Sequence, residues 1–317
     1  LSFDTSTLSR TGLLTPGMST EDVKRFAIPD RVLFETNAAG EVTATLLSPQ
    51  SHLKLALRGG HVQGWRLEGQ TNDVLWMSDV APRVPGKPHR GGVPICWPWF
   101  GAQLDGAKLP SHGVARTTPF EVVDTHCDAD WTCLSMTLAD RSQLPAAYSG
   151  LDLSVHVRVG PRMVISLETT NGGPDTVELT QALHTYFAVG DIVNIAIRGL
   201  EGCSYADALE GLATKSTVGD ITFDAEVDRI YTHSGGSIRL VDPGLDRTIR
   251  VESEGSRSCV VWNPWIEKSE RLGDMAPEAY RRMVCIETAN AGADIIKLEP
   301  GQRHRLTAEI SVAPLSQ

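Results

Sequence analysis

The strongest constraint on the fold is a two-residue alternation of apolar and polar side chains that recurs along most of the chain. It is clearest from Leu151 to Val159, which is followed by Met163 to Thr169 after the turn residues Gly160-Pro161-Arg162. Such alternation places one face of a strand in a core, and two runs joined by a short Gly-Pro turn predict an antiparallel hairpin. No run of about ten residues shows a firm 3.6-residue period, so we expect few, short and peripheral helices.

The same alternation predicts many further strands, separated by Gly and Pro residues. Numerous short strands at close spacing are typical of a sandwich or barrel, and we expect an all-β fold built as a large antiparallel sandwich. The predicted strands cover residues 42–47, 52–57, 62–67, 74–77, 120–123, 131–138, 177–187, 193–197, 237–241, 248–252, 260–262, 283–286 and 306–312. The charged segment between the strands at 260–262 and 283–286 is predicted to be irregular.

Residues 1 to 31 are polar and uneven, and they lack the alternation of the rest of the chain. Ser19 is expected to cap a short helix over Thr20 to Phe26, which Pro29 would end. We interpret this segment as an extension that covers a sheet edge. Residues 32 to 317 contain no internal repeat, low-complexity stretch or linker, so they are expected to form a single β-sandwich domain.

The charge balance narrows the range of partners. The chain has 29 Lys and Arg against 39 Asp and Glu, a formal net charge of -10, and it contains no basic run. This argues against nucleic acid and anionic membrane surfaces as partners. No apolar stretch approaches the roughly 18 residues of a membrane span, and the sequence opens without the pattern of a signal peptide, so we expect a cytoplasmic protein.

Cysteine spacing and the absence of standard motifs bear on cofactors. The six cysteines form no Cys-x-x-Cys pair, so reduced and mostly buried thiols are expected, although a structural disulfide stays open. There is no Gly-x-Gly-x-x-Gly, Walker or Gly-x-Ser-x-Gly motif, and the nine histidines include no His-x-x-x-His or His-x-His. We therefore expect no nucleotide cofactor and no dedicated metal site, with the chemistry performed by side chains alone.

Two loop motifs could bind an anion. Arg90-Gly91-Gly92 leads into the aromatic run Trp97-Pro98-Trp99-Phe100, and the glycines would let a ligand approach the backbone while Arg90 clamps it. Ser111-His112-Gly113 precedes Arg116, and a second guanidinium could share a phosphate that the acidic chain would otherwise repel. The alternatives are a turn that leads into core aromatics and an ordinary polar surface.

Three single residues could carry chemistry or bind substrate. His184 lies in an otherwise apolar strand, where its ordinary pKa near 6.5 would suit proton transfer, although a core histidine satisfied by a backbone partner is the alternative. Glu287 follows a buried strand and could be tuned by desolvation, or could simply be a strand-end residue in solvent or in an ion pair. Asp228 is a charged residue at the start of a predicted strand, where it could bind substrate. It could instead be an exposed residue paired with Arg229.

Taken together, these segments resemble the glucose-6-phosphate 1-epimerase family within the larger aldose 1-epimerase group. The motifs that carry the resemblance are Arg90 to Ile95, His112 to Arg116, Leu183 to Phe187, Val261 to Trp265 and Cys285 to Glu287, and the similar region extends from about residue 32 to 312.

The resemblance implies a β-supersandwich of the galactose-mutarotase type that needs no cofactor. It implies His184 as general acid and Glu287 as general base, and substrate contacts from Arg90, His112, Arg116 and Asp228. Ser111 is placed among the substrate contacts, although family members often carry Gln there. The expected activity is interconversion of the α and β anomers of an aldohexose 6-phosphate by a monomer or weak oligomer.

Two other functions remain open from the sequence. A glycoside hydrolase on a similar sandwich would use two carboxylates, such as Asp228 and Glu287. A sugar-phosphate binding or sensing protein would keep the pocket without turnover.

Overall fold

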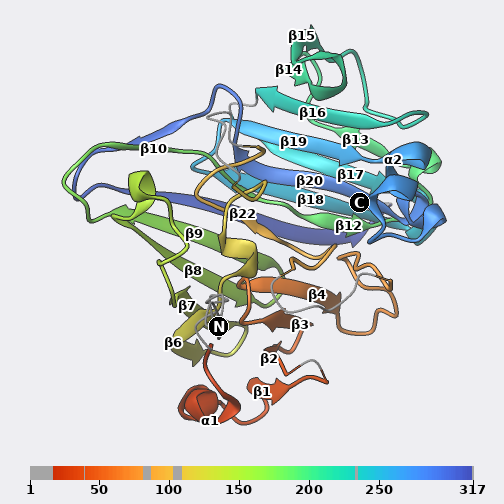
Figure 1. The fold of residues 1–317 in the computed structure, drawn as a ribbon. Coiled ribbons are helices and arrows are strands. Elements are labelled where there is room, and N and C mark those ends of the chain that lie inside the picture. Colours follow the sequence, from red (N-terminus) through yellow and green to blue (C-terminus); the bar gives the residue numbers. More distant parts are fainter. Residues whose placement is uncertain (1–16, 39, 81–86, 103–108, 233–234, 316–317) are drawn as a thin grey trace, which may run out of the picture.

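The computed structural model describes residues 17–38, 40–80, 87–102, 109–232 and 235–315. They form two eight-stranded antiparallel sheets, one four-stranded sheet and a two-stranded ribbon. In Figure 1 the four-stranded sheet lies at the bottom of the view beside α1, and the β14–β16 edge of one eight-stranded sheet lies at the top. The predicted all-β antiparallel sandwich is confirmed.

The four-stranded sheet and the first eight-stranded sheet are built from antiparallel neighbours. The four-stranded sheet contains β1 (Val32–Thr36), β2 (Val42–Leu47), β3 (Ser51–Ala56) and β4 (His61–Leu67). The first eight-stranded sheet runs in the order β13 (Ala196–Arg198), β17 (Ser237–Asp242), β18 (Arg247–Glu254), β22 (Arg303–Pro314), β9 (Met163–Asn171), β8 (Leu151–Val159), β7 (Thr132–Leu138) and β6 (Phe120–Cys127).

The second eight-stranded sheet carries most of the residues that the sequence singled out. It runs in the order β15 (Ala213–Ser216), β14 (Ser204–Asp207), β16 (Val227–Thr232), β19 (Ser258–Asn263), β20 (Met283–Asn290), β11 (Gln181–Leu183) and β5 (Ile95–Cys96), and β12 (Tyr186–Ala188) also pairs with β20. The ribbon joins β10 (Val177–Leu179) to β21 (Ile296–Leu298).

Helices are few and short, as predicted. The α-helices are α1 (Thr20–Val23) and α2 (Trp265–Leu272), and the 3-10 turns are Lys24–Phe26, Ala115–Thr117, Ala146–Tyr148, Ile192–Asn194, Ala208–Glu210, Pro243–Leu245 and Pro277–Arg282. No helix among the described residues combines the length and the apolar character that a membrane span requires.

The predicted hairpin is confirmed residue by residue. Strands β8 and β9 pair from Val159 opposite Met163 to Leu151 opposite Asn171. Alternate residues of β8 are buried in the main core, which also takes in one face of the second eight-stranded sheet. The opposite face of that sheet packs a smaller apolar cluster that includes Trp262, Cys285 and Tyr186.

The segment before β1 lies against two sheet edges. Ser19 caps α1, as predicted, and it forms a capping box with Asp22. The thioether of Met18 accepts a hydrogen bond from the backbone of Val122 in the edge strand β6. Helix α1 also contacts β1, the edge of the four-stranded sheet. Residues 1–16 of the predicted extension lie outside the described part of the chain, and the division into an extension and a single domain stays a prediction.

Some sequence-based boundaries were wrong. Residues 74–77 form only isolated bridges, because Leu75 pairs with Phe187 whereas Met77 pairs with Gly91. The strand expected at 193–197 begins at Ala196, because the side chain of Asp191 caps a 3-10 turn at Val193.

The strand expected at 177–187 is three short strands instead of one. The interruption between β11 and β12 holds His184 and Thr185, and the pairing with β20 keeps the same register on both sides of it.

The segment predicted to be irregular contains α2. Asn263, at the end of β19, donates from its side chain to the carbonyls of Tyr280 and Met283 and accepts from the backbone of Trp265. The first two contacts span 17 and 20 residues, so a local periodicity could not reveal them.

All six cysteines lie in the described part of the chain and are free, and four of them are buried. The expectation of reduced, mostly buried thiols is confirmed.

One glycine shows how tightly the loop before Arg116 is held. Gly113 has a φ of 75°, and a Cβ at this position would lie 2.0 Å from the carbonyl oxygen of Trp97. Gly69 has a similar φ of 73° but has open space around it. Only the first position therefore combines backbone strain with a steric clash.

We predict that Gly113→Ala lowers the free energy of unfolding by more than about 2 kcal/mol, because the backbone of Trp97 must move. Gly69→Ala should cost only about 1 kcal/mol, since it carries the left-handed strain alone. Denaturant titration measures both values. Equal losses in the two variants would contradict the predicted clash.

Candidate functional site

A row of four directly paired residues crosses the second eight-stranded sheet. Asp228 of β16 lies opposite Trp262 of β19, Trp262 lies opposite Cys285 of β20, and Cys285 lies opposite Tyr186 of β12. Directly opposed residues of antiparallel strands share one face of the sheet. The register therefore assembles these side chains on the face away from the main core.

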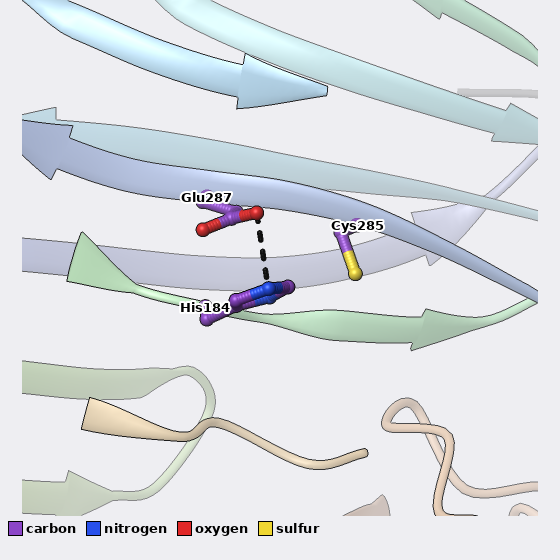
Figure 2. Close-up of side chains that lie close together, drawn as sticks. All are labelled: His184, Cys285 and Glu287. Carbon is purple, nitrogen blue, oxygen red and sulfur yellow. Dashed lines mark ion pairs between the residues drawn. The ribbon is translucent and has the colours of Figure 1, made fainter. Parts of the chain in front are cut away.

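Glu287 joins this face because it follows Cys285 by two residues on β20. Its side chain is only 1% exposed, and its Oε1 lies 3.3 Å from Nδ1 of His184. Figure 2 shows the carboxylate on β20 directed at the imidazole, with the thiol of Cys285 beside them. The interpretation of Glu287 as a solvent-facing strand end is wrong.

His184 lies opposite Glu287 because the pairing with β20 has the same register before and after the break between β11 and β12. Its backbone N–H donates to the carbonyl of Pro94 on the β5 side, and the carbonyl of Thr185 accepts from Ile286 of β20. The imidazole stacks on Tyr186 with ring centroids 4.8 Å apart and meets Trp262 edge-on at 6.0 Å.

The hydrogen bonding of the pair is incomplete. Nδ1 of His184 and Oε2 of Glu287 are buried and have no hydrogen-bond partner among the described residues. A core histidine would normally have its ring nitrogens satisfied, so the alternative of a structural His184 is not supported. Buried polar atoms without partners on two adjacent side chains are expected at a binding site, where a ligand supplies the missing hydrogen bonds.

Burial moves the two pKa values in opposite directions. Desolvation raises the pKa of Glu287 well above 4.5, and the charge of Asp228 raises it further while Arg116 lowers it. Desolvation lowers the pKa of His184 well below 6.5, assisted by His112, Arg116 and Arg90. Together these shifts favour a neutral acid beside a neutral imidazole, a state in which the pair shares one transferable proton.

Arg90 is anchored by groups that the sequence did not indicate. Its Nε and Nη2 donate to Oδ2 of Asp274, and its Nη1 donates to the hydroxyl of Tyr186. Gly91 and Gly92 permit this placement, because a Cβ at either position would lie within 2.4 Å of a backbone oxygen. Three of the five guanidinium N–H groups of Arg90 are used, which leaves at most two for a ligand.

The loop from Ser111 to Arg116 contributes a second guanidinium. Nη2 of Arg116 donates to the carbonyl of Ser111, while its Nε is buried without a partner among the described residues. The side chain of Ser111 is exposed. His112 lies edge-on to His184 with ring centroids 5.8 Å apart, and burial lowers the pKa of His112 to about 3, so this ring is neutral.

Asp228 lies at the other side of the site and pairs with a lysine that sequence reasoning missed. Lys268 of α2 approaches Oδ2 of Asp228 at 3.4 Å and Oε1 of Glu226 at 2.8 Å. Burial raises the pKa of Asp228, and Lys268 acts against that rise. The predicted partner Arg229 lies instead near Asp207.

The structure brings most of the predicted residues into contact or electrostatic range. His184 and Glu287 touch, and Arg90, His112, Arg116 and Asp228 act on them through contacts or charge. Ser111 contributes its backbone carbonyl. Sequence reasoning missed Tyr186, Trp262, Asp274, Lys268 and Cys285, and of these only Tyr186, Trp262 and Cys285 lay inside motifs that carried the resemblance.

A metal ion would find one group of ligands here. Among the described residues, His184, Cys285 and Glu287 are the cluster whose ligand atoms all lie close together, within 4.8 Å of one another. The expectation of no dedicated metal site rested on the absence of short histidine motifs within one segment. A cluster formed by residues of two separate segments produces no such motif.

Similarity to known proteins identifies the family. The sequence matches the Aldose 1-epimerase family over residues 43–311. The chain belongs to the aldose 1-epimerase family. A relative from Escherichia coli K12, named for glucose-6-phosphate 1-epimerase activity, is 36% identical over 245 residues, which cover 77% of this chain and 81% of that protein. A relative of the same name from Cenchrus ciliaris is 31% identical over 274 residues, or 83% and 82% of the two chains.

Solved structures agree with this aldose 1-epimerase assignment. A protein from Salmonella typhimurium described as a mutarotase superposes with a TM-score of 0.83 at 30% identity and covers 94% of this chain and 97% of its own. A galactose mutarotase-like protein from Clostridium acetobutylicum, at 11% identity and a TM-score of 0.71, covers 89% of this chain and 98% of its own and shares the fold. The galactose-mutarotase type of sandwich and the isomerase class are therefore confirmed.

We predict that the imidazole of His184 stays neutral at pH values well below 6.5, the ordinary pKa of histidine, because burial disfavours the charged form. Histidine Cε1–H resonances followed by NMR between about pH 4 and pH 8 measure this, and His184→Ala identifies the signal. A His184 midpoint at or above 6.5 would show that its surroundings stabilise the cation instead.

Proposed function

We propose that this aldose 1-epimerase interconverts the α and β anomers of an aldohexose 6-phosphate, with glucose 6-phosphate as the first candidate. The observation that carries the proposal is the buried contact of 3.3 Å between His184 and Glu287, with Arg90, Arg116 and Asp228 in electrostatic range. The relatives from Escherichia coli and Cenchrus ciliaris, named for activity on glucose 6-phosphate, support this choice of sugar.

The reaction needs one group that accepts a proton and one that donates a proton. The C1 hydroxyl loses its proton while the ring oxygen gains one, and the ring opens to an aldehyde. Rotation about the C1–C2 bond presents the other face of the aldehyde, and the reverse transfers close the ring. A pair that holds one proton in total can perform both transfers without net exchange with solvent.

We assign Glu287 as the base and His184 as the acid in the reacting complex. The resting pair is a neutral acid beside a neutral imidazole, and the 3.3 Å contact lets the proton pass from Glu287 to His184 when the polar sugar enters. This transfer produces a carboxylate that accepts the C1 proton and an imidazolium that protonates the ring oxygen. Stacking of His184 on Tyr186 fixes the ring plane for that donation.

The phosphate is assigned chiefly to Arg116. Its buried Nε has no hydrogen-bond partner among the described residues, so it offers a donor that an anion can satisfy. Arg90 is already held by Asp274 and Tyr186, and we assign its remaining donors to sugar oxygens or to a share of the phosphate. Asp228, Ser111 and His112 complete the proposed substrate contacts.

The other two functions are less well supported. Glu287 has His184 as its close partner, whereas Asp228 is paired with Lys268, so the site lacks the exclusive carboxylate pair of a glycoside hydrolase. A binding protein without turnover would have no need for an unsatisfied acid beside a base.

We predict that the protein accelerates exchange between the anomers of glucose 6-phosphate, measured by magnetisation-exchange NMR. His184→Ala and Glu287→Gln should each lower the enzymatic rate by about 10²- to 10⁴-fold, because each removes one proton-transfer partner. His126→Ala, in the exposed part of β6, is the matched control and should retain the rate. A wild-type protein that leaves the exchange rate unchanged would refute the proposed reaction.

We also predict that Arg116→Met lowers kcat/KM for glucose 6-phosphate by about 10- to 100-fold, as expected for loss of a charge-assisted contact worth about 1.5–3 kcal/mol. Activity on unphosphorylated glucose should change little. Arg250→Met, which removes an exposed guanidinium of β18, is the control. Equal losses on both sugars would show that Arg116 does not recognise the phosphate.

A further inference from the structure

The thiol of Cys285 lies beside the catalytic pair, and the proposed reaction does not use it. Cys285 and Glu287 occupy alternate positions of β20, so both side chains emerge from the same face of that strand. His184 faces them from the break between β11 and β12, as Figure 2 shows. One nitrogen, one sulfur and one oxygen atom from these residues all lie within 4.8 Å of one another.

The three atoms have the chemistry and nearly the spacing of a zinc site. Imidazole nitrogen, thiolate sulfur and carboxylate oxygen are the usual protein ligands of Zn²⁺, with bonds of about 2.0–2.3 Å. Tetrahedral geometry with such bonds separates a nitrogen from an oxygen by about 3.3 Å. Nδ1 of His184 and Oε1 of Glu287 already lie 3.3 Å apart, and the sulfur of Cys285 lies within 4.8 Å of the other ligand atoms.

An independent observation also indicates a missing ligand. Nδ1 of His184 and Oε2 of Glu287 are both buried, and neither has a hydrogen-bond partner among the described residues. His184 is 8% exposed and Glu287 is 1% exposed. A cation bound between the imidazole and the carboxylate would satisfy Nδ1 of His184, whereas the aromatic rings of Tyr186 and Trp262 that pack against the imidazole cannot.

We propose that His184, Cys285 and Glu287 form a binding site for a thiophilic divalent cation such as Zn²⁺, and that the bound cation inhibits the enzyme by occupying both proton-transfer groups. The inhibition rests on the proposed function, whereas the binding does not. Three protein ligands leave a fourth coordination position for water. Mg²⁺ and Ca²⁺ prefer oxygen ligands, so the thiol and the imidazole select against them.

The charge and the protons balance in this complex. Formation of the metal–sulfur bond displaces the thiol proton of Cys285, and ionisation of Glu287 releases the carboxyl proton, both to the buffer. The thiolate and the carboxylate then neutralise the two positive charges of the cation, and neutral His184 adds none. The nearby Asp228 favours the cation, whereas Arg90 and Arg116 oppose it.

Co²⁺ titration of the full chain tests the binding directly, because a Co²⁺–thiolate bond gives a charge-transfer band in the near ultraviolet. We expect this band in the wild type and its loss in Cys285→Ser, which keeps the size of the side chain. Cys127→Ser, which removes the exposed cysteine of β6, is the matched control and should retain the band. A wild type without the band, or a Cys285→Ser variant that retains it, would overturn the proposal.

Anomer exchange in the presence of Zn²⁺ tests the inhibition. We expect Zn²⁺ to lower the wild-type rate at least about ten-fold, with recovery on addition of EDTA and no effect of Mg²⁺. Cys285→Ser, compared with its own rate without metal, should lose at least about ten-fold in Zn²⁺ sensitivity. Equal sensitivity of this variant and the wild type would contradict the site.

Two further measurements keep the outcomes distinct. Zn²⁺ should raise the Tm of the wild type and not that of Cys285→Ser, and a melting curve for the variant shows that it folds. If the Co²⁺ band appears but no anomer exchange is catalysed, the metal site stands and the proposed function falls. If exchange is catalysed and the wild type shows no Co²⁺ band, the metal site falls alone.

Discussion

Burial of an acid beside a base on one face of a sheet is the constraint on which the rest of this structure depends. Desolvation penalises the charged forms of both Glu287 and His184, so their shared state of lowest cost contains a single proton. Reversible ring opening requires that state, since the C1 hydroxyl loses a proton while the ring oxygen gains one. The surrounding aromatics and the strand register serve to keep the pair dry and adjacent.

Two features of the backbone create this arrangement. The register that aligns Asp228, Trp262, Cys285 and Tyr186 brings four strands to one line of side chains. The pairing with β20 also keeps one register across the break between β11 and β12, since Leu183 pairs with Thr288 and Tyr186 with Cys285, so His184 lies at the position opposite Glu287. The cost is a pair of buried polar atoms without partners among the described residues, as is common where function competes with stability.

Much of the fold could be predicted from the sequence, because alternation is a local signal. The β8–β9 hairpin followed from this pattern. The resemblance of contiguous motifs singled out His184 and Glu287, whose roles stay a prediction. Contacts across distant segments could not be predicted in the same way. Asp274 binds Arg90 from 184 residues away, and Lys268 reaches Asp228 from a short helix held by Asn263. Neither contact leaves a periodic or compositional trace.

The central claim is that the pair carries its proton on a neutral carboxyl group before the sugar binds. Infrared difference spectroscopy at neutral pH between the wild type and Glu287→Gln observes this group directly. We expect a stretching band of a protonated carboxyl group that is present in the wild type and absent from the variant. A carboxylate band in its place, together with a neutral imidazole at His184, would leave the pair without a proton to donate and would contradict the claim.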